Sequence, residues 1–382
     1  MATLAHTVSR ADPGGGTGTG TPARPRSVRH LGPNWYAAVM GTAIVAGAGA
    51  ALPFTATGAR LAYQAVWALS ALMLLALLVA RGVHWVRHGD QARRDLLDPA
   101  VAPFHGCTAM ALLAVGGGTL AVGREVIGAP AALAADAVLW SLGTLVGLTA
   151  AAAIPYLMVT RHRIDAGSAS PVWLLPLVAP MVSAALGPAL VPHLPAGPWQ
   201  QTLLYACYAL FGMSLLATLL VLPLVMSRLL HHGPLPLALT PTLFLVLGPL
   251  GQSTTAVTNL AHVAPGVVDA SLAPAMDAFA VLYGVPVMGF ALLWLALATA
   301  MVVRAVRNGM GFTMTWWGFT FPLGTCVTGA AGLARQTGLG VFDGLAVALY
   351  ALLVTAVAVA FTRTALGLAR GHLPAPPRPV TP

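Results

Sequence analysis

Lysine is absent from this 382-residue chain, and acidic residues are rare, at nine aspartates and one glutamate. Charged residues make up 8% of the sequence and hydrophobic residues 58%, whereas a soluble protein carries about 25% charged residues to cover its surface. This deficit excludes most cytosolic enzymes and all disordered proteins, and it indicates that lipid surrounds the chain. The three cysteines lie apart inside apolar runs, which excludes a disulfide framework and a paired metal motif.

The net charge of +9 comes from 19 arginines. A nucleic-acid-binding protein would gather them on a soluble face with aromatic residues between them. Here they separate long apolar runs, which is typical of loops at a membrane surface. We therefore expect no nucleic-acid partner.

Ten apolar stretches of about 18 residues or more carry almost no charge, and each can cross about 30 Å of hydrocarbon as a helix. Backbone groups in lipid must be bonded internally, and short alternating segments typical of a barrel are absent, so we predict helices. The expected fold class is all-α integral membrane, with ten transmembrane helices. The predicted spans are 34–52, 61–80, 103–122, 134–159, 172–191, 200–227, 237–261, 275–303, 313–334 and 343–369.

The arginines also predict the orientation of these helices. With the N-terminus inside, sixteen arginines lie in inside segments, and only Arg60, Arg124 and Arg335 lie outside. This asymmetry follows the positive-inside rule for an even number of helices with both termini in the cytoplasm. We expect a plasma membrane of bacterial type, a flexible cytoplasmic tail at 1–30, a transmembrane domain at 31–370 and a cytoplasmic Pro-rich tail at 371–382.

No acidic residue is expected near the middle of a span. Glu125 ends the third predicted helix, Asp136 opens the fourth and Asp277 opens the eighth. Carriers that relay protons or bind Na⁺ usually keep a carboxylate at mid-membrane, membrane enzymes need acid and base groups, and cation pores use acidic rings. The pattern argues against all three and suits a neutral path for anions.

Proline recurs at the odd-numbered predicted helices, at Pro33, Pro103, Pro176, Pro180, Pro249 and Pro322. Proline inside a spanning helix frees a carbonyl, which helices around a cavity can use. We interpret the odd helices as lining a path. Pro223 and Pro286 in the even helices leave open the alternative that proline is simply common in membrane helices.

The seventh predicted helix is the most polar. Gly248, Gln252, Thr255 and Asn259 are spaced i, i+4, i+7 and i+11, so they share one face. Such a face can line an aqueous path or form hydrogen bonds between helices, and the spacing does not choose between these two roles.

Phe321 lies near the centre of the ninth predicted helix, on a face with Gly324, Thr325 and Thr328. A large apolar ring among small polar residues is a candidate plug, since apolar constrictions gate by dewetting. Spacing alone still favours ordinary packing for this ring.

His105 is the only histidine near the start of an odd-numbered helix. A haem or metal site would need a second histidine at the same depth, and His84, His193 and His262 lie near span ends. We predict no metal and no cofactor.

Four motifs occur in order along the chain. They are Pro33-Asn34-Trp35-Tyr36-Ala37-Ala38-Val39-Met40-Gly41-Thr42, Trp173-Leu174-Leu175-Pro176 with Pro180-Met181, Gly248-Pro249-Leu250-Gly251-Gln252-Ser253, and Trp316-Trp317-Gly318-Phe319-Thr320-Phe321-Pro322. Together they resemble the tellurite-resistance/dicarboxylate transporter family, which includes the yeast malate permease and sulfite pump and the plant slow anion channels.

The resemblance implies five helical hairpins, with the odd helices around a central pore and the even helices outside, in a homotrimer. It also implies that a phenylalanine of the ninth helix plugs the pore; the matching position is Phe321, with Phe319 as the fallback. His105 departs from the aromatic or small residue expected at its position. With the resemblance in view we assign the pore lining to Asn34, Gly41, Thr42, Phe104, His105, Pro180, Gly248, Gln252, Thr255, Asn259, Gly324, Thr325 and Thr328.

The expected function is the passage of small anions across the lipid bilayer, such as malate or another C4-dicarboxylate, sulfite, or an inorganic anion, with no catalysis. Channel and carrier stay open as alternatives, and the carrier would be a proton-coupled dicarboxylate carrier. A membrane-embedded enzyme or redox protein would need histidines or carboxylates gathered at one depth, and the sequence offers no such cluster.

Overall fold

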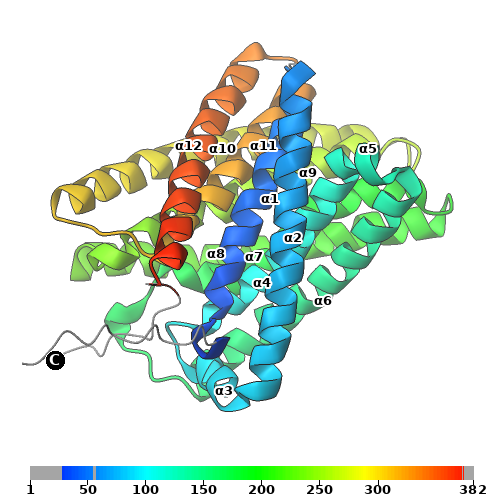
Figure 1. Ribbon diagram of the computed structural model, residues 1–382. Coiled ribbons are helices and arrows are strands. Elements are labelled where there is room, and N and C mark those ends of the chain that lie inside the picture. The colour runs from blue at the N-terminus through cyan, green and yellow to red at the C-terminus, as the bar shows by residue number, and fades with distance from the viewer. Residues whose placement is uncertain (1–27, 55–56, 372, 374–382) are drawn as a thin grey trace, which may run out of the picture.

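The computed structural model describes residues 28–54, 57–371 and 373, and within these residues it contains helices and no strand (Figure 1). Most of the predicted tails, 1–30 and 371–382, therefore lie outside the described residues. The described end of the N-terminal segment, Val28–His30, is a short 3₁₀ helix, and its Arg29 forms an ion pair of 2.8 Å with Asp90.

Five long helices form the periphery of the molecule, as Figure 1 shows for α2 and α12 on either side of α1. They are α2 (Thr57–Arg87), α6 (Ala129–Thr160), α8 (Pro198–His232), α10 (Ala273–Arg307) and α12 (Gly340–Ala369). Only 22–28% of the most apolar stretch of each is buried. Their outward faces carry exposed leucines such as Leu220 and Leu282, which a protein in water would not present in such number.

Five shorter helices lie inside this periphery and are mostly buried. They are α1 (Tyr36–Ala50), α4 (Gly106–Gly118), α7 (Leu174–Leu186), α9 (Leu247–Val263) and α11 (Thr320–Thr337). After α4 the chain continues as a π-helical turn, Thr119–Gly123, and the short α5 (Arg124–Ile127); after α7 it continues as the 3₁₀ segment Gly187–His193. The segments built on α4 and α7 are 78% and 83% buried, in clear contrast to the peripheral helices.

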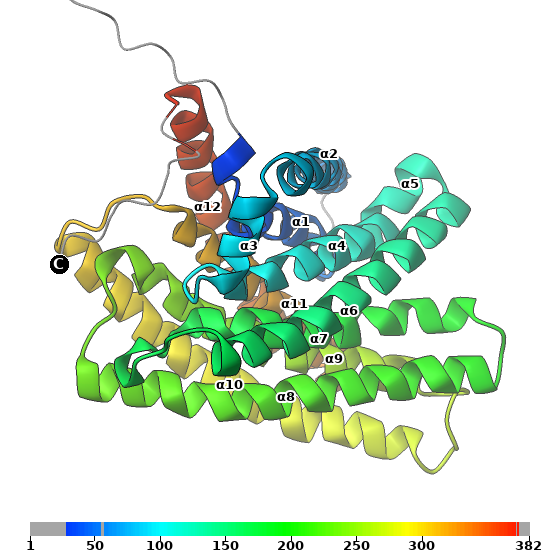
Figure 2. The ribbon, with the colours of Figure 1, turned by 90° about the horizontal axis from the view of Figure 1, so that it is seen from below.

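The inner helices form a closed ring. α1 packs against α4, α4 against α7, α7 against α9, α9 against α11, and α11 returns to α1. Each outer helix packs on the inner helix that precedes it in the chain. It also packs on the next inner helix of the ring: α2 on α4, α6 on α7, α8 on α9, α10 on α11, and α12 on α1. In Figure 2 the outer helix α8 crosses the lower part of the view, and α7 lies beside it.

Glycines permit the close contacts within the ring. A Cβ on Gly251 of α9 would lie 2.5 Å from the backbone nitrogen of Cys326 in α11. A Cβ on Gly106 would collide with the Leu175 carbonyl of α7, and one on Gly324 with Ile44 of α1. Small residues that let helices approach are typical of packing in membranes.

Every inner helix begins with a 3₁₀ segment. These segments are Pro33–Trp35, Ala102–His105, Pro171–Trp173, Leu237–Val246 and Met314–Phe319. Pro176, Pro249 and Pro322 each occupy the third residue of the α-helix that follows, within the first turn, where proline is tolerated best. Proline inside a helix occurs at Pro180 of α7, and in outer helices at Pro155, Pro223 and Pro286, so internal proline does not distinguish inner from outer helices.

Seven helical segments of the described chain are long and apolar enough to cross a membrane. The segments outside this set are the inner helices α1 and α9, with 15 and 17 residues, and α11, which carries four threonines, a glutamine and an arginine. The short helix α3 (Gly89–Leu97) follows α2, and a further 3₁₀ turn, Ala166–Ser168, precedes α7.

The prediction that Asp136 opens its helix is wrong. Helix α6 begins at Ala129, so Asp136 is its eighth residue and lies two turns inside the helix. Its side chain is only 2% exposed and its Oδ1 has no hydrogen-bond partner. The predicted start at residue 134 was late because Gly128, with φ at 86°, and Pro130 begin the helix one and a half turns earlier.

Candidate functional site

Two cavities lie inside the ring of inner helices, and all five helices contribute to each. The wide cavity has a volume of about 170 Å³ and the narrow cavity about 10 Å³. The wide cavity is lined by Ala43, Ile44, Gly47, Ala51, Ala114, Gly117, Gly118, Ala121, Val182, Leu186, Gln252, Thr255, Asn259, Phe321, Thr328 and Arg335. The narrow cavity is lined by Met40, Met110, Leu174, Leu175, Val178, Leu245, Gly248, Phe321 and Pro322.

The lining residues show that the inner helices run in the same direction. The narrow cavity takes residues from the beginning of each inner segment, and the wide cavity takes residues further along each one. All five helix N-termini therefore lie on the side of the narrow cavity. Because a helix N-terminus carries partial positive charge, this end of the ring is electrostatically favourable for anions.

Phe321 is the residue shared by both cavities. It comes from the first turn of α11, and its side chain is 3% exposed. Its ring thus lies between the wide and the narrow cavity, inside the ring of helices. Phe319 lines neither cavity; it contacts Phe244 and Trp316, with ring centroids 4.8 and 5.7 Å apart.

The polar side of the wide cavity comes from α9 and α11. The Oγ1 atoms of Thr255 and Thr328 are 2.8 Å apart and share a hydrogen bond. Asn259 Nδ2 donates to the Ala185 carbonyl of α7 at 2.9 Å. The buried Gln252 Oε1 has no partner. The spacing of these residues allowed two roles, lining a cavity or bonding to neighbouring helices. The polar face of α9 does both.

Arg335 is a lining residue that the sequence reasoning used only for orientation. It occupies the last turn of α11 and contributes the one charged side chain among the residues that line the wide cavity. Its Nη2 approaches Asn259 Oδ1 at 3.5 Å. A signal for it exists in the sequence: Phe321, Thr328 and Arg335 are spaced by seven residues, which keeps them near one helix face.

The other predicted lining residues border neither cavity. Gly41 faces Thr320 and Trp317, and Gly324 faces Ile44; Thr325 is fully buried beside Gly251. The remaining ones lie near the start of their inner segments or within the packed core: Asn34, Thr42, Phe104, His105 and Pro180. Their assignment to a pore stays a prediction.

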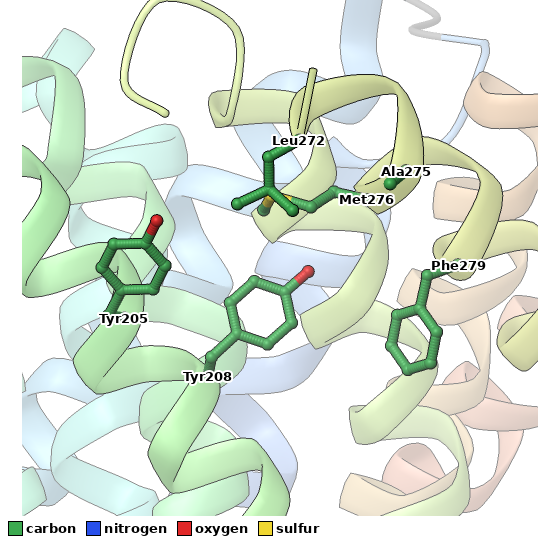
Figure 3. A pocket seen from close by; sticks show the side chains of 6 residues that line it. All are labelled: Tyr205, Tyr208, Leu272, Ala275, Met276 and Phe279. Atoms are coloured by element: carbon green, nitrogen blue, oxygen red, sulfur yellow. The ribbon is translucent and has the colours of Figure 1, made fainter. Parts of the chain in front are cut away.

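Larger pockets lie outside the ring. Figure 3 shows one of about 300 Å³, in which Tyr205 and Tyr208 of α8 face Met276 and Phe279 of α10. No charged side chain lines it, and α8 and α10 both belong to the periphery. It therefore lacks the chemistry that a polar substrate would need. No group of three or more His, Cys, Asp or Glu side chains able to hold a metal occurs among the described residues.

Comparison with known proteins decides the family. The family described as voltage-dependent anion channel (SLAC1) matches the chain over residues 30–365. The chain belongs to this family. The resemblance drawn from the four motifs is thereby confirmed.

Several curated proteins align with this chain over most of its length and most of their own. An uncharacterized transporter of Methanocaldococcus jannaschii is 25% identical over 338 residues, which are 88% of this chain and 93% of the relative. The sulfite efflux pump SSU1 of Trichophyton rubrum is 27% identical over 323 residues, 83% of this chain and 85% of the pump. The corresponding pump of Arthroderma otae is 26% identical over 330 residues, 84% of this chain and 86% of the pump.

Proposed function

We propose that this protein moves small oxyanions such as sulfite out of the cell, along the axis of the five inner helices, and that the ring of Phe321 closes this path. One observation carries the proposal: two cavities within a single ring of helices meet at one aromatic side chain. Sulfite is proposed first because curated relatives of similar length are named sulfite efflux pumps. A C4-dicarboxylate such as malate is the alternative substrate.

The charges along the path favour anions. The five parallel helix N-termini offer partial positive charge at one end, and Arg335 lies at the other. Of the described residues that line either cavity, none is acidic. A cation would meet no compensating charge on such a path.

We further propose that all ten helices cross the membrane as five hairpins, with the N-termini of the inner helices and both chain termini in the cytoplasm. The short inner helices need little hydrophobicity of their own, because the outer helices separate them from lipid. A homotrimer is the proposed assembly. Mass measurement of the purified protein in detergent tests it, and a monomeric mass would contradict it.

The gate is tested by replacing Phe321→Ala and measuring sulfite efflux from proteoliposomes. Removing the ring joins the two cavities, so the initial flux should rise severalfold. Phe319→Ala is the matched control, since it removes the same side chain two residues away and outside both cavities.

Three outcomes count against parts of this proposal. Unchanged flux for a folded Phe321→Ala protein contradicts the gate. An increase for Phe319→Ala alone moves the gate to that residue. If malate moves and sulfite does not in the same vesicles, the substrate class must be changed, and movement of cations alone would refute anion transport.

A proton-coupled carrier is a second candidate, supported by Asp136. This buried carboxyl in α6 packs against Gly116 of α4, next to the cavity-lining Gly117 and Gly118. An ionisable side chain inside a membrane helix often serves in proton relay. If the carrier mechanism holds, a pH gradient should drive anion uptake in the wild type, and Asp136→Asn should abolish this response.

A further inference from the structure

Arg335 carries a positive charge that the surrounding protein does not neutralise. Four ion pairs occur among the described residues, namely Arg29–Asp90, Arg60–Glu125, Arg81–Asp95 and His84–Asp95. Arg60, another of the arginines predicted to lie outside, is thus compensated by Glu125, whereas Arg335 belongs to none of these pairs. Asp277 borders a neighbouring polar pocket together with Arg335 but makes no ion pair with it.

Arg335 lines both the wide cavity and the neighbouring polar pocket, and its contact with Asn259 lies on the side of the wide cavity. Asn259 is fixed on one side by its hydrogen bond to Ala185 of α7, and its Oδ1 faces Arg335 Nη2 at 3.5 Å. An amide oxygen can orient a guanidinium without cancelling its charge. The other guanidinium N–H groups stay free for a ligand, because no further hydrogen bond of this side chain is found in the described structure.

Deeper in the same cavity lies a polar group without a hydrogen-bond partner. Gln252 is 3% exposed, lines the wide cavity, and its Oε1 makes no hydrogen bond. The amide can accept a hydrogen bond with its oxygen and donate with its nitrogen. Between Gln252 and Arg335 the wall continues with the Thr255–Thr328 hydroxyl pair, so polar groups line this side of the cavity from Arg335 to Gln252.

We infer that Arg335, positioned by Asn259, is an anion-recruiting site at the outer end of the wide cavity, and that it sets the affinity for oxyanions presented from that side. The planar guanidinium binds two oxygens of a carboxylate or of an inorganic oxyanion side by side. From this site the anion passes along the hydroxyl pair to the Gln252 amide, directly outward of Phe321. The inference rests on the proposed function, because it assigns a binding step to the same path.

The effect of Arg335 should depend on the side from which the anion arrives. An anion from the side of the narrow cavity meets the helix N-termini and Phe321 before it reaches Arg335. An anion from the opposite side meets Arg335 first. Removal of the charge should therefore weaken uptake from the outer side and leave the half-saturating concentration at the inner side unchanged.

The test compares Arg335→Gln, Arg335→Lys and Arg124→Gln in proteoliposomes, with sulfite presented from one side at a time. Arg335→Gln should raise the half-saturating concentration from the outer side about ten-fold, since it removes a charge-assisted hydrogen bond. Arg335→Lys should keep most of the affinity. Arg124→Gln is the matched control: Arg124 is also predicted to lie outside and forms none of the four ion pairs, but it does not line the cavity.

Chemical restoration of the charge separates recruitment from misfolding. Arg335→Cys should be rescued by bromoethyltrimethylammonium, which restores a positive charge through a thioether, and not by iodoacetamide, which adds a neutral group of the same linkage. The native cysteines Cys107, Cys207 and Cys326 are buried, so they are protected from both reagents. Because the cationic reagent does not cross the bilayer, it also reports which side Arg335 faces.

The failures of the two proposals are distinguishable. If the wild type moves sulfite but Arg335→Gln matches both the wild type and Arg124→Gln from the outer side, the recruiting site is wrong and anion transport stands. Equal rescue by the cationic and the neutral reagent also overturns the role of charge. If the wild type moves no anion at all, the proposed function itself fails.

Discussion

At the level of single residues, the consequence of an ionisable side chain depends on whether it is exposed or enclosed. Arg335 lies exposed at the end of α11 and borders the wide cavity, whereas Asp136 is enclosed between α6 and α4 without a compensating cation. A buried charge without a partner is costly, far more so than a buried neutral amide. The two residues therefore have opposite expected effects when neutralised: loss of substrate affinity for Arg335, and gain of stability for Asp136.

Asp136→Asn should raise the thermal unfolding temperature of the purified protein at neutral pH. Asparagine has the same shape, so the contact with Gly116 is preserved while the ionisable group is removed; we expect a gain of roughly 1 kcal/mol or more. The change in unfolding temperature is measured by heating the protein in detergent and monitoring its tryptophan fluorescence. Asp343→Asn in the first turn of α12 is the control, and a lower unfolding temperature for Asp136→Asn alone would contradict the cost assigned to the buried charge.

At the level of helices, the inner ring depends on close backbone contact. The tripeptide Pro-Leu-Gly occurs in the first two turns of both α9 and α11, at Pro249–Gly251 and at Pro322–Gly324. In each case the glycine faces the next helix of the ring: Gly251 faces α11, and Gly324 faces α1. The same local sequence thus serves the same purpose in two segments of the chain, namely to let adjacent inner helices touch.

Gly251→Ala should destabilise the protein by about 1–3 kcal/mol, because its methyl group would be forced against the backbone of Thr325 and Cys326. Gly289→Ala is the control within outer helix α10, where an added Cβ would meet no atom within 4 Å. Its unfolding temperature should stay the same or rise slightly, since alanine favours the helix. Equal effects of the two substitutions in thermal unfolding would show that ring contact does not limit stability.

For the whole molecule, the outer helices and the inner helices have different roles. The outer helices are apolar on the surface that faces away from the ring, and the inner helices carry most of the glycines, threonines and amides that border the cavities. Inner helices such as α9 and α11 can carry polar residues because they meet protein rather than lipid. Because inner and outer helices alternate along the chain, every inner N-terminus lies on the side of the narrow cavity, and this arrangement gives the proposed path a polarity.

The orientation of this path is tested by introduced cysteines. Ala196→Cys lies in the loop that follows inner helix α7, and Asn308→Cys lies in the loop that precedes inner helix α11, so the two loops lie at opposite ends of the ring. A membrane-impermeant thiol reagent added to intact cells should label Ala196→Cys and leave Asn308→Cys unlabelled until the membrane is opened. The reverse pattern would place the termini outside. The unsubstituted protein is the control, since its cysteines are buried.

The sequence by itself determined the membrane environment, the helical class and the family, because these follow from composition, from the length of apolar runs and from motifs that are local in the chain. Of the residues predicted to line a pore, Gln252, Thr255, Asn259, Phe321 and Thr328 border the wide cavity, and their role in transport stays a prediction. Only the tertiary structure decided which polar or small residues face the axis and which face a neighbour. Gly324 and Thr325 follow Phe321 closely in sequence, yet neither borders a cavity, while Arg335 does. Helical spacing groups residues on one face, but the direction of that face depends on how each helix is rotated within the ring, and packing against the neighbouring helices sets that rotation.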